Sequence, residues 1–147
     1  MSPSGKCFVS GPRGYFGLES PHSLFGKMKL LGVFSGFYEQ LEVFDATGEI
    51  WRVQELRCRY QKSWWLTILV HTVYNPWVDV SASWREPMEY RIEDLKVAYT
   101  KAVDQDDDIL TQFVEASELK TKIAAAASFE DLADVYRWME ADHSDKK

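Results

Sequence analysis

Hydrophobic and polar residues alternate in the middle of the chain, which is the spacing of β-strands. Residues 78–84, VDVSASW, alternate strictly, so that every second side chain is apolar. A period of two predicts a strand with one buried face. Residues 41–53, LEVFDATGEIWRV, hold two shorter apolar runs separated by a polar turn at 45–48, whose last residue is glycine. We therefore predict a hairpin here, with glycine where the backbone needs a positive φ.

Two other segments are apolar without alternating. Residues 64–74, WWLTILVHTVY, are apolar almost throughout and are followed by Asn75 and Pro76, which end the run. A continuous apolar run of this kind is typical of a strand that is covered on both faces. We therefore predict that it forms a central strand of the sheet. Residues 27–37, KMKLLGVFSGF, are interpreted as a further strand.

The period changes in the last third of the chain. Apolar residues recur there at helical spacing in three segments, residues 90–103, 108–126 and 128–140. The third segment opens with Ser128 as a candidate N-cap and has Asp131 three residues later, which is the pattern of a capping box. The sequence therefore predicts three amphipathic helices.

This order of elements predicts an α+β fold, in which an antiparallel sheet of about five strands over residues 28–92 is followed by three helices packed on one face. Residues 28–147 are expected to form a single domain. Residues 1–27 carry five of the eight glycines and three of the five prolines, so we expect an irregular arm that packs partly on this domain. The other face of the central strand then needs a cover, which the arm or a second subunit could supply.

The composition is that of an ordinary folded protein, but the charge is uneven. Of the 147 residues, 46% are hydrophobic and 27% are charged, a balance that argues against disorder. Residues 1–85 carry a net charge of +2, and residues 86–147 carry a net charge of −8. An acidic half repels a phosphate backbone and favours a basic partner. The six tryptophans indicate an aromatic core or an aromatic binding surface.

The sequence offers little for a metal or a cofactor to bind. Its two cysteines, Cys7 and Cys58, do not form a CxxC pair, and no GxGxxG, Walker-type, GxSxG or HExxH motif is present. We therefore expect no metal and no cofactor. The sparse cysteines favour a reducing compartment. No apolar run approaches the roughly 20 residues that cross a bilayer, so we expect a cytoplasmic protein without a membrane partner.

Four aspartates lie just before the second predicted helix. Asp104, Asp106 and Asp108 fall at the first, third and fifth places of an EF-hand calcium loop. The sixth place of that loop requires glycine, and here it is Ile109, a β-branched residue that resists the left-handed conformation. Acidic residues at the start of a helix interact well with its free N–H groups. The sequence therefore favours a helix start over a calcium site.

His71 is the one histidine inside a predicted core element. No local motif places a serine or cysteine nucleophile beside it, so a strand histidine held by hydrogen bonds is favoured over a general base. The alternative is a pocket between the sheet and the helices, lined by His71, Trp64 and Tyr74. Such a pocket would serve a small-ligand binder or an enzyme.

Basic and aromatic residues are interleaved in residues 52–65, RVQELRCRYQKSWW. Arg57, Arg59 and Trp64 belong to this stretch, and arginine and tryptophan are enriched at protein-binding hot spots. The same pattern on a sheet can stack the bases of single-stranded nucleic acid. Solvated arginines beside core aromatics are a third interpretation. Because the rest of the chain is acidic, protein contact is favoured over nucleic acid.

These observations favour recognition over catalysis. We expect a non-enzymatic protein-binding domain, such as an acidic inhibitor or immunity-type protein that acts on a basic partner. A ligand binder or enzyme with an aromatic pocket near His71 is the alternative, and nucleic-acid binding by the Arg/Trp-rich sheet comes third. A homodimer is compatible with the sequence. The acidic candidates for partner binding are Asp104, Asp106, Asp107, Glu115, Glu118, Asp134 and Glu140.

Overall fold

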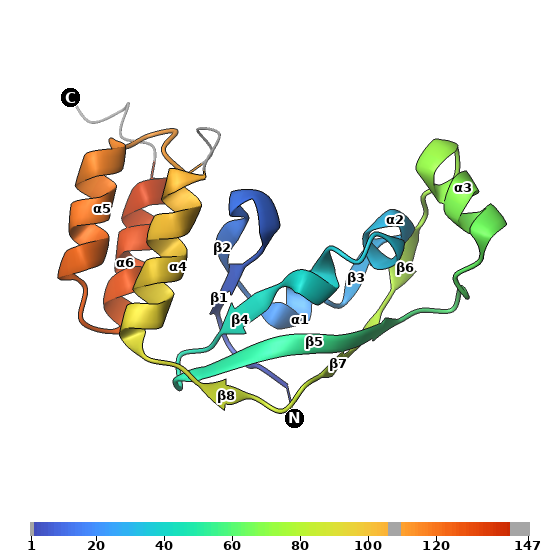
Figure 1. Cartoon of the computed structure of the whole chain (residues 1–147), viewed down its shortest axis with the longest axis horizontal. Helices are drawn as coiled ribbons and strands as arrows, with labels where there is room; N and C mark the ends of the chain where they lie inside the picture. Colours follow the sequence, from blue (N-terminus) through green and yellow to red (C-terminus); the bar gives the residue numbers. More distant parts are fainter. Residues whose placement is uncertain (1, 106–109, 142–147) are drawn as a thin grey trace.

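The structure is a computed structural model that describes residues 2–105 and 110–141. It has the expected α+β architecture, with an antiparallel sheet followed by three helices (Figure 1). The main sheet has the strand order β2-β1-β4-β5-β7, and β8 also pairs with β5. Its strands are β1 (Cys7–Ser10), β2 (Phe16–Glu19), β4 (Glu42–Phe44), β5 (Glu49–Arg57), β7 (Ser81–Trp84) and β8 (Met88–Glu89).

The main sheet begins inside the segment that we expected to be an irregular arm. Strand β1 pairs with β2 on one side and with β4 on the other. The prolines and glycines that suggested irregularity lie largely outside these strands. Some form the tight connection between β1 and β2, which contains the 3₁₀ turn η1 (Pro12–Gly14) and Gly14 at a φ of +76°. The expectation of an irregular arm over residues 1–27 was therefore wrong, because residues that form turns between strands were interpreted as a sign of irregular structure.

Three helices cover one face of the main sheet, as the sequence predicted. They are α4 (Ile92–Asp104), α5 (Ala116–Ala125) and α6 (Phe129–Glu140). The second helix begins later than the predicted 108, and Asp104 ends α4 instead of starting α5, so the prediction of a helix start at Asp104 was wrong. The predicted cap is present, because the backbone N–H of Asp131 donates to the hydroxyl of Ser128 over 3.2 Å. Phe8 of β1 is fully buried beneath these helices. Its ring lies 5.1–6.0 Å, between centroids, from the rings of Phe16, Phe129, Tyr99 and Tyr136.

The opposite face of the sheet is covered by the chain between β2 and β4. Cys7 and Val9 point to this side, since side chains alternate along β1. They pack with Phe25 and Met28, which come from the segment of α1 (Pro21–Leu24) and β3 (Lys27–Lys29). The first 27 residues therefore supply part of the cover of this face.

The predicted hairpin is present as strands β4 and β5. Asp45 opens the turn and is buried, and its Oδ1 accepts hydrogen bonds from the backbone N–H groups of Thr47 and Glu49, each over 2.9 Å. Gly48 has a φ of +96°, as expected for the last turn residue. Tyr90 fastens the turn from outside, because its hydroxyl donates to the carbonyl oxygen of Asp45 over 2.6 Å.

Residues 64–74 do not form a central strand. They contain helix α3 (Trp64–Thr72), which packs against α2 (Leu30–Phe34) through Leu66 and Val70. The prediction was wrong because an apolar run without periodicity is compatible with a helix as well as a strand. Ser63 was the overlooked signal, since its hydroxyl caps the helix by accepting the N–H of Leu66 over 3.3 Å.

Two other strand predictions need adjustment. Residues 27–37 start as β3 but continue into α2, so only their beginning is a strand. Residues 78–84 are extended as predicted, but they divide between β6 (Trp77–Asp79), which pairs with β3, and β7, which pairs with β5. Val80 at the junction contacts the cores of both regions. None of the helices in the described part of the chain has the length and apolarity needed to span a membrane.

Candidate functional site

Helix α3 lies at one end of the molecule, away from helices α4–α6 (Figure 1). The described residues include nine large hydrophobic side chains that are exposed, and six of them come from α3 and the segment that follows it. We call these six the α3 surface. The exposed fraction reaches 78% at Trp64 and 83% at Val73. The α3 surface consists of Trp64, Trp65, Ile68, Val73, Tyr74 and Trp77.

The α3 surface exists because α3 is apolar on more than one face. Leu66 and Val70, one helical turn apart, point inward and fill the contact with α2 and β6. Trp64, Trp65 and Ile68 point away from that contact and stay exposed. A helix that is hydrophobic all round is usually buried on all sides. Among the described residues, only the side of α3 that carries Leu66 and Val70 is buried.

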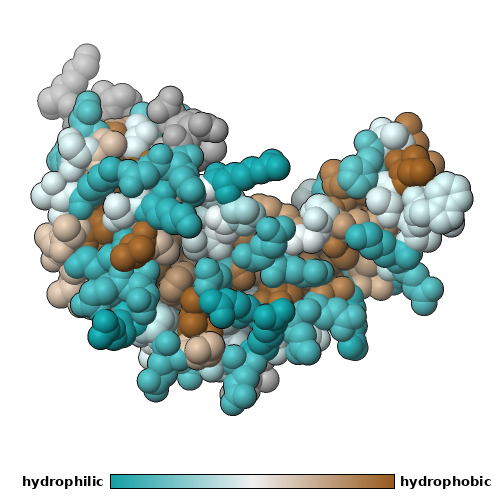
Figure 2. Space-filling view, viewed as in Figure 1, coloured by the Kyte–Doolittle hydropathy of each residue, from teal (hydrophilic) through white to brown (hydrophobic). Residues whose placement is uncertain are grey.

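The exposed apolar area of the α3 surface is comparable with the largest apolar patch of a typical monomer. Trp64, Trp65 and Trp77 are each more than half exposed. With about 250 Å² for a whole tryptophan side chain, these three alone present roughly 480 Å². The largest apolar patch on a typical monomer covers about 300–600 Å² and is often functional. Figure 2 shows brown and pale side chains gathered at this end.

The base of the α3 surface is held by two tyrosines. The hydroxyls of Tyr60 and Tyr74 lie 2.9 Å apart, so the chain before α3 is tied to the chain after it. The hydrogen bond between the two hydroxyls, together with one from Arg59, lowers the pKa of Tyr60. The same hydrogen bond is the main cause of the raised pKa of Tyr74. This pairing fixes Tyr74 at the edge of the surface.

The aromatic pocket expected near His71 is not formed by the three residues proposed for it. His71, Trp64 and Tyr74 are exposed on α3 and just after it. The Nδ1 atom of His71 lies 2.7 Å from the carbonyl oxygen of Thr67, one turn earlier in the same helix. The prediction placed these residues in a buried strand, whereas the helix turns them to solvent. The structure therefore removes the basis for a buried general base at His71.

The basic and aromatic residues of 52–65 do not form one open face of the sheet. Trp51 of β5, which precedes them, is buried in the core. Arg57 forms an ion pair with Glu55 over 2.9 Å. Arg59 contacts the hydroxyl of Tyr60, and Trp64 belongs to α3 rather than to the sheet. Arg59 and Trp64 therefore belong to the end of the molecule that carries the α3 surface.

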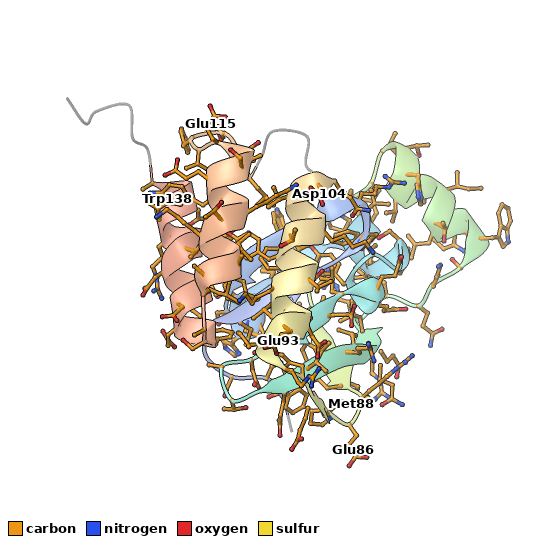
Figure 3. All side chains as sticks on the ribbon, turned by 60° about the vertical axis from the view of Figure 1, so that its left-hand side comes forward. Glu86, Met88, Glu93, Asp104, Glu115 and Trp138 are labelled. Atoms are coloured by element: carbon orange, nitrogen blue, oxygen red, sulfur yellow. The ribbon has the colours of Figure 1, made fainter. Side chains whose placement is uncertain are left out.

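Several acidic candidates lie at the opposite end of the molecule. The chain reverses between successive helices, which brings the end of α4 and the start of α5 together; Asp104 and Glu115 lie at these ends (Figure 3). Glu115 and Glu118 border a hollow of about 540 Å³ that Trp138 also lines. Glu140 is the last residue of α6. Asp106 and Asp107 lie outside the described residues.

Two of the acidic candidates have cationic partners within the chain. The carboxylate of Asp104 pairs with the ammonium group of Lys120. That of Asp134 pairs with the guanidinium of Arg137, 2.9 Å away and three residues later in α6. These pairs partly neutralise the acidic end. The sequence-based set of candidates therefore divides into an acidic helical end and the basic, aromatic end around α3.

The buried thiol of Cys7 in β1 is not suited to act as a nucleophile. The thiol of Cys7 is fully buried, and desolvation together with the nearby carboxylate of Asp45 raises its pKa to about 12. A thiol in this state is a poor nucleophile. Within residues 2–105 and 110–141, no three His, Cys, Asp or Glu side chains gather closely enough to hold a metal ion.

The sequence singled out Trp64 and Tyr74 as candidates and placed Trp65 in the basic and aromatic stretch, but it did not predict the α3 surface. All of residues 64–74 were assigned to a central strand, and Trp77 was not considered. The N-cap at Ser63 would have indicated a helix, and a helix so uniformly apolar would have raised the question of what covers it. Comparisons with protein-family models, curated proteins and solved structures found no match to this chain.

Proposed function

We propose that the protein is a non-enzymatic protein-binding domain and that the α3 surface is its main contact surface. The observation that carries this proposal is the concentration of exposed large hydrophobic side chains on α3 and the residues after it. A standard protein–protein interface buries about 800 Å² on each partner, with a central group of aromatic anchors. The α3 surface offers three tryptophans and a tyrosine for that role.

The arrangement also supplies the rigidity that a binding surface needs. Leu66 and Val70 fix α3 on its support, and the Tyr60–Tyr74 contact fixes the chain at its base. A preordered surface loses less conformational freedom on binding. A cytoplasmic location remains part of the proposal, supported by two free cysteines.

The test is capture of a partner by variants of the α3 surface. The Trp64→Ala/Ile68→Ala variant removes two exposed anchors and leaves Leu66 and Val70 in place. We expect it to lose roughly 30-fold in affinity, because a hot-spot tryptophan contributes about 2 kcal/mol or more. The Val97→Ala/Phe113→Ala variant is the matched control, since both of its side chains are exposed at the helical end. We expect this control to bind like the unmodified protein.

A photo-crosslinking amino acid identifies the contact directly. Placed at Ile68, it should become linked to the same partner that the unmodified protein captures from host lysate. Placed at Val97, it should not. Linkage from Val97 alone, or unchanged capture by the Trp64→Ala/Ile68→Ala variant, would remove the α3 surface from consideration.

The acidic helical end is a second candidate, for a basic partner such as the target of an inhibitor or immunity-type protein. Its support is the position of Asp104, Glu115, Glu118 and Glu140 at the ends of three adjacent helices. The C-terminal ends of α4 and α6 add negative potential there. Charge reversal by Glu115→Lys/Glu118→Lys should abolish capture if this surface binds the partner. Capture should be unchanged if the α3 surface binds it.

A further inference from the structure

Positive charges lie beside the α3 surface, and three of them have uncharged partners. The ammonium nitrogen of Lys29 lies 5.1 Å from the centre of the Trp77 ring and 3.4 Å from the carbonyl oxygen of Asn75. The ammonium group of Lys62, two residues before α3, donates to the carbonyl oxygen of Phe34 over 3.0 Å. These contacts orient the two cations but leave their charge uncompensated.

Arg59 is the third such cation. Its guanidinium donates to the hydroxyl of Tyr60 over 3.2 Å and lies 5.0 Å from the centre of that ring. Residues 57–78, which contain α3, include neither Asp nor Glu. Within residues 2–105 and 110–141, none of the three cations forms an ion pair with a carboxylate. The α3 surface is therefore bordered by positive charge, although the protein as a whole carries a net charge of −6.

A hollow on the β3 side of Trp77 extends this positive border. It has a volume of about 590 Å³, and Lys6, Lys27 and Lys29 line it together with the hydroxyl side chains of Ser20 and Ser23. One carboxylate, that of Glu19, also lines the hollow and accepts a hydrogen bond from the hydroxyl of Tyr15 over 2.9 Å. Asp79 lies directly across from Lys27 in the β3–β6 pair, so three cations face two carboxylates and the hollow keeps a net positive charge.

The charges and the hollow help to decide what binds the α3 surface: a second copy of the chain, a lipid bilayer or another protein. A second copy that paired the same surfaces around a two-fold axis would bring Arg59, Lys62 and Lys29 close to their own counterparts, which like charges disfavour. An anionic bilayer also fits the charge, so vesicle binding is one of the outcomes distinguished below. We argue for a protein, because it can place a projecting carboxylate in the hollow beside Trp77 and cover the tryptophans at the same time.

We propose that the partner of the α3 surface is a protein with an apolar groove bordered by carboxylates. Its apolar groove receives Trp64, Trp65 and Ile68. Its carboxylates meet Lys62 and Arg59 on one side, and Lys29 with the adjoining hollow on the other. This inference rests on the proposed function, because it names the partner chemistry of the same surface. The charges increase the association rate and the specificity, while the tryptophans supply most of the affinity.

Carbodiimide coupling of the complex tests this directly, because it joins a lysine amine to a carboxylate in contact with it and leaves no spacer. The full-length protein is incubated with host lysate at low salt, coupled, isolated and digested for mass spectrometry. We expect Lys29 and Lys62 to be linked to Asp or Glu residues of the captured protein. The isolated partner should then bind at least about tenfold more weakly to the Lys29→Glu/Lys62→Glu variant.

The control variant Lys101→Glu/Lys122→Glu changes the net charge by the same amount at the helical end and should bind normally. Binding of the unmodified protein should weaken between about 0.1 M and 1 M salt, across which the Debye length falls from about 10 Å to 3 Å. The binding of the Lys29→Glu/Lys62→Glu variant should change less with salt.

Three results would overturn the inference. The first is a partner whose binding is lost in the Trp64→Ala/Ile68→Ala variant but changes neither with salt nor in the Lys29→Glu/Lys62→Glu variant. This result would leave the proposed function intact. The second is self-association in sedimentation velocity that Trp64→Ala/Ile68→Ala abolishes, which identifies a second copy as the occupant. The third is co-sedimentation with phosphatidylglycerol vesicles and not with phosphatidylcholine vesicles, with the same dependence on Trp64 and Ile68. The third result would also overturn the proposed function.

Discussion

The indole N–H of Trp51 donates a hydrogen bond to Oδ2 of Asp45 over 2.9 Å, and both residues are buried. This bond joins the turn between β4 and β5 to the core beneath it. The other carboxylate oxygen, Oδ1, accepts three bonds from the turn itself, two from Thr47 and one from Glu49. A single carboxylate therefore fixes the hairpin on which the sheet is built.

Replacement of Asp45 by Asn should destabilise the fold by about 1–3 kcal/mol. If the Asn oxygen keeps the bonds from Thr47 and Glu49, its amide N–H₂ group faces the indole N–H of Trp51, and two donors then meet in a buried position. Urea unfolding followed by circular dichroism measures the loss. Asp79→Asn, at an exposed position in β6, should change stability by less than about 0.5 kcal/mol. Equal effects of the two substitutions would contradict the role given to Asp45.

The stability of the protein should fall in acid because of the same carboxylate. Burial of Asp45 opposes its ionisation, but hydrogen bonds from Trp51, Thr47 and Glu49 outweigh burial and lower its pKa. The pKa of Asp45 is therefore lower in the folded state than the value of about 3.9 in the unfolded state. The stabilisation by its carboxylate is fully present above the unfolded-state pKa and is lost as pH falls through the folded-state pKa. The stability difference between the unmodified protein and Asp45→Asn should therefore narrow below about pH 4. Urea midpoints measured at a series of pH values test this, and a constant difference would refute it.

Phe8 should be among the most costly core residues to truncate, although it lies in the segment that the sequence suggested was an arm. It is fully buried and contacts four aromatic rings. Phe8→Ala should lower the free energy of unfolding by about 3–5 kcal/mol. Val97→Ala, at an exposed position of α4, should cost less than about 0.5 kcal/mol. A small effect of Phe8→Ala in thermal or urea unfolding would mean that β1 is not part of the core.

The two cysteines should differ in reactivity. Cys7 is fully buried, and its pKa is raised to about 12 by desolvation and by Asp45, so its thiolate is scarce near neutral pH. Cys58 is partly exposed at the end of β5. A thiol reagent such as dithionitrobenzoate should therefore modify one cysteine in the native protein and two after unfolding. The Cys58→Ser variant should show no rapid reaction in the native state, and rapid modification of this variant would contradict the burial of Cys7.

The helical region was predictable because each helix carries its own local signals. The apolar spacing places Leu95, Tyr99 and Ala102 on one face of α4, and all three are buried in the structure. Ser128 marks the start of α6 as a cap. The β4–β5 hairpin was predictable for a similar reason, since Asp45 and Gly48 define a turn from within four residues. In each case neighbouring residues determine the backbone conformation.

The candidate site was only partly predictable. Trp64 was selected because of its residue type, and it does belong to the α3 surface. The pocket proposed around His71 depended on a strand that is not there, so its three residues face solvent. Lys29 could not be connected with Trp77 from the sequence, because 48 positions separate them and only the pairing of β3 with β6 brings them together.

The sequence by itself determined the α+β class, the three C-terminal helices and the hairpin, because periodicity, caps and turn residues act over a few neighbouring positions. The tertiary structure alone decided that helix α3 keeps one side uncovered. An apolar run without a period shows that a segment is apolar, but it does not show which part of the protein packs against it. Leu66 and Val70 pack against α2, whereas the tryptophans beside them stay exposed among the described residues. Which apolar residues remain exposed is thus a property of the packing.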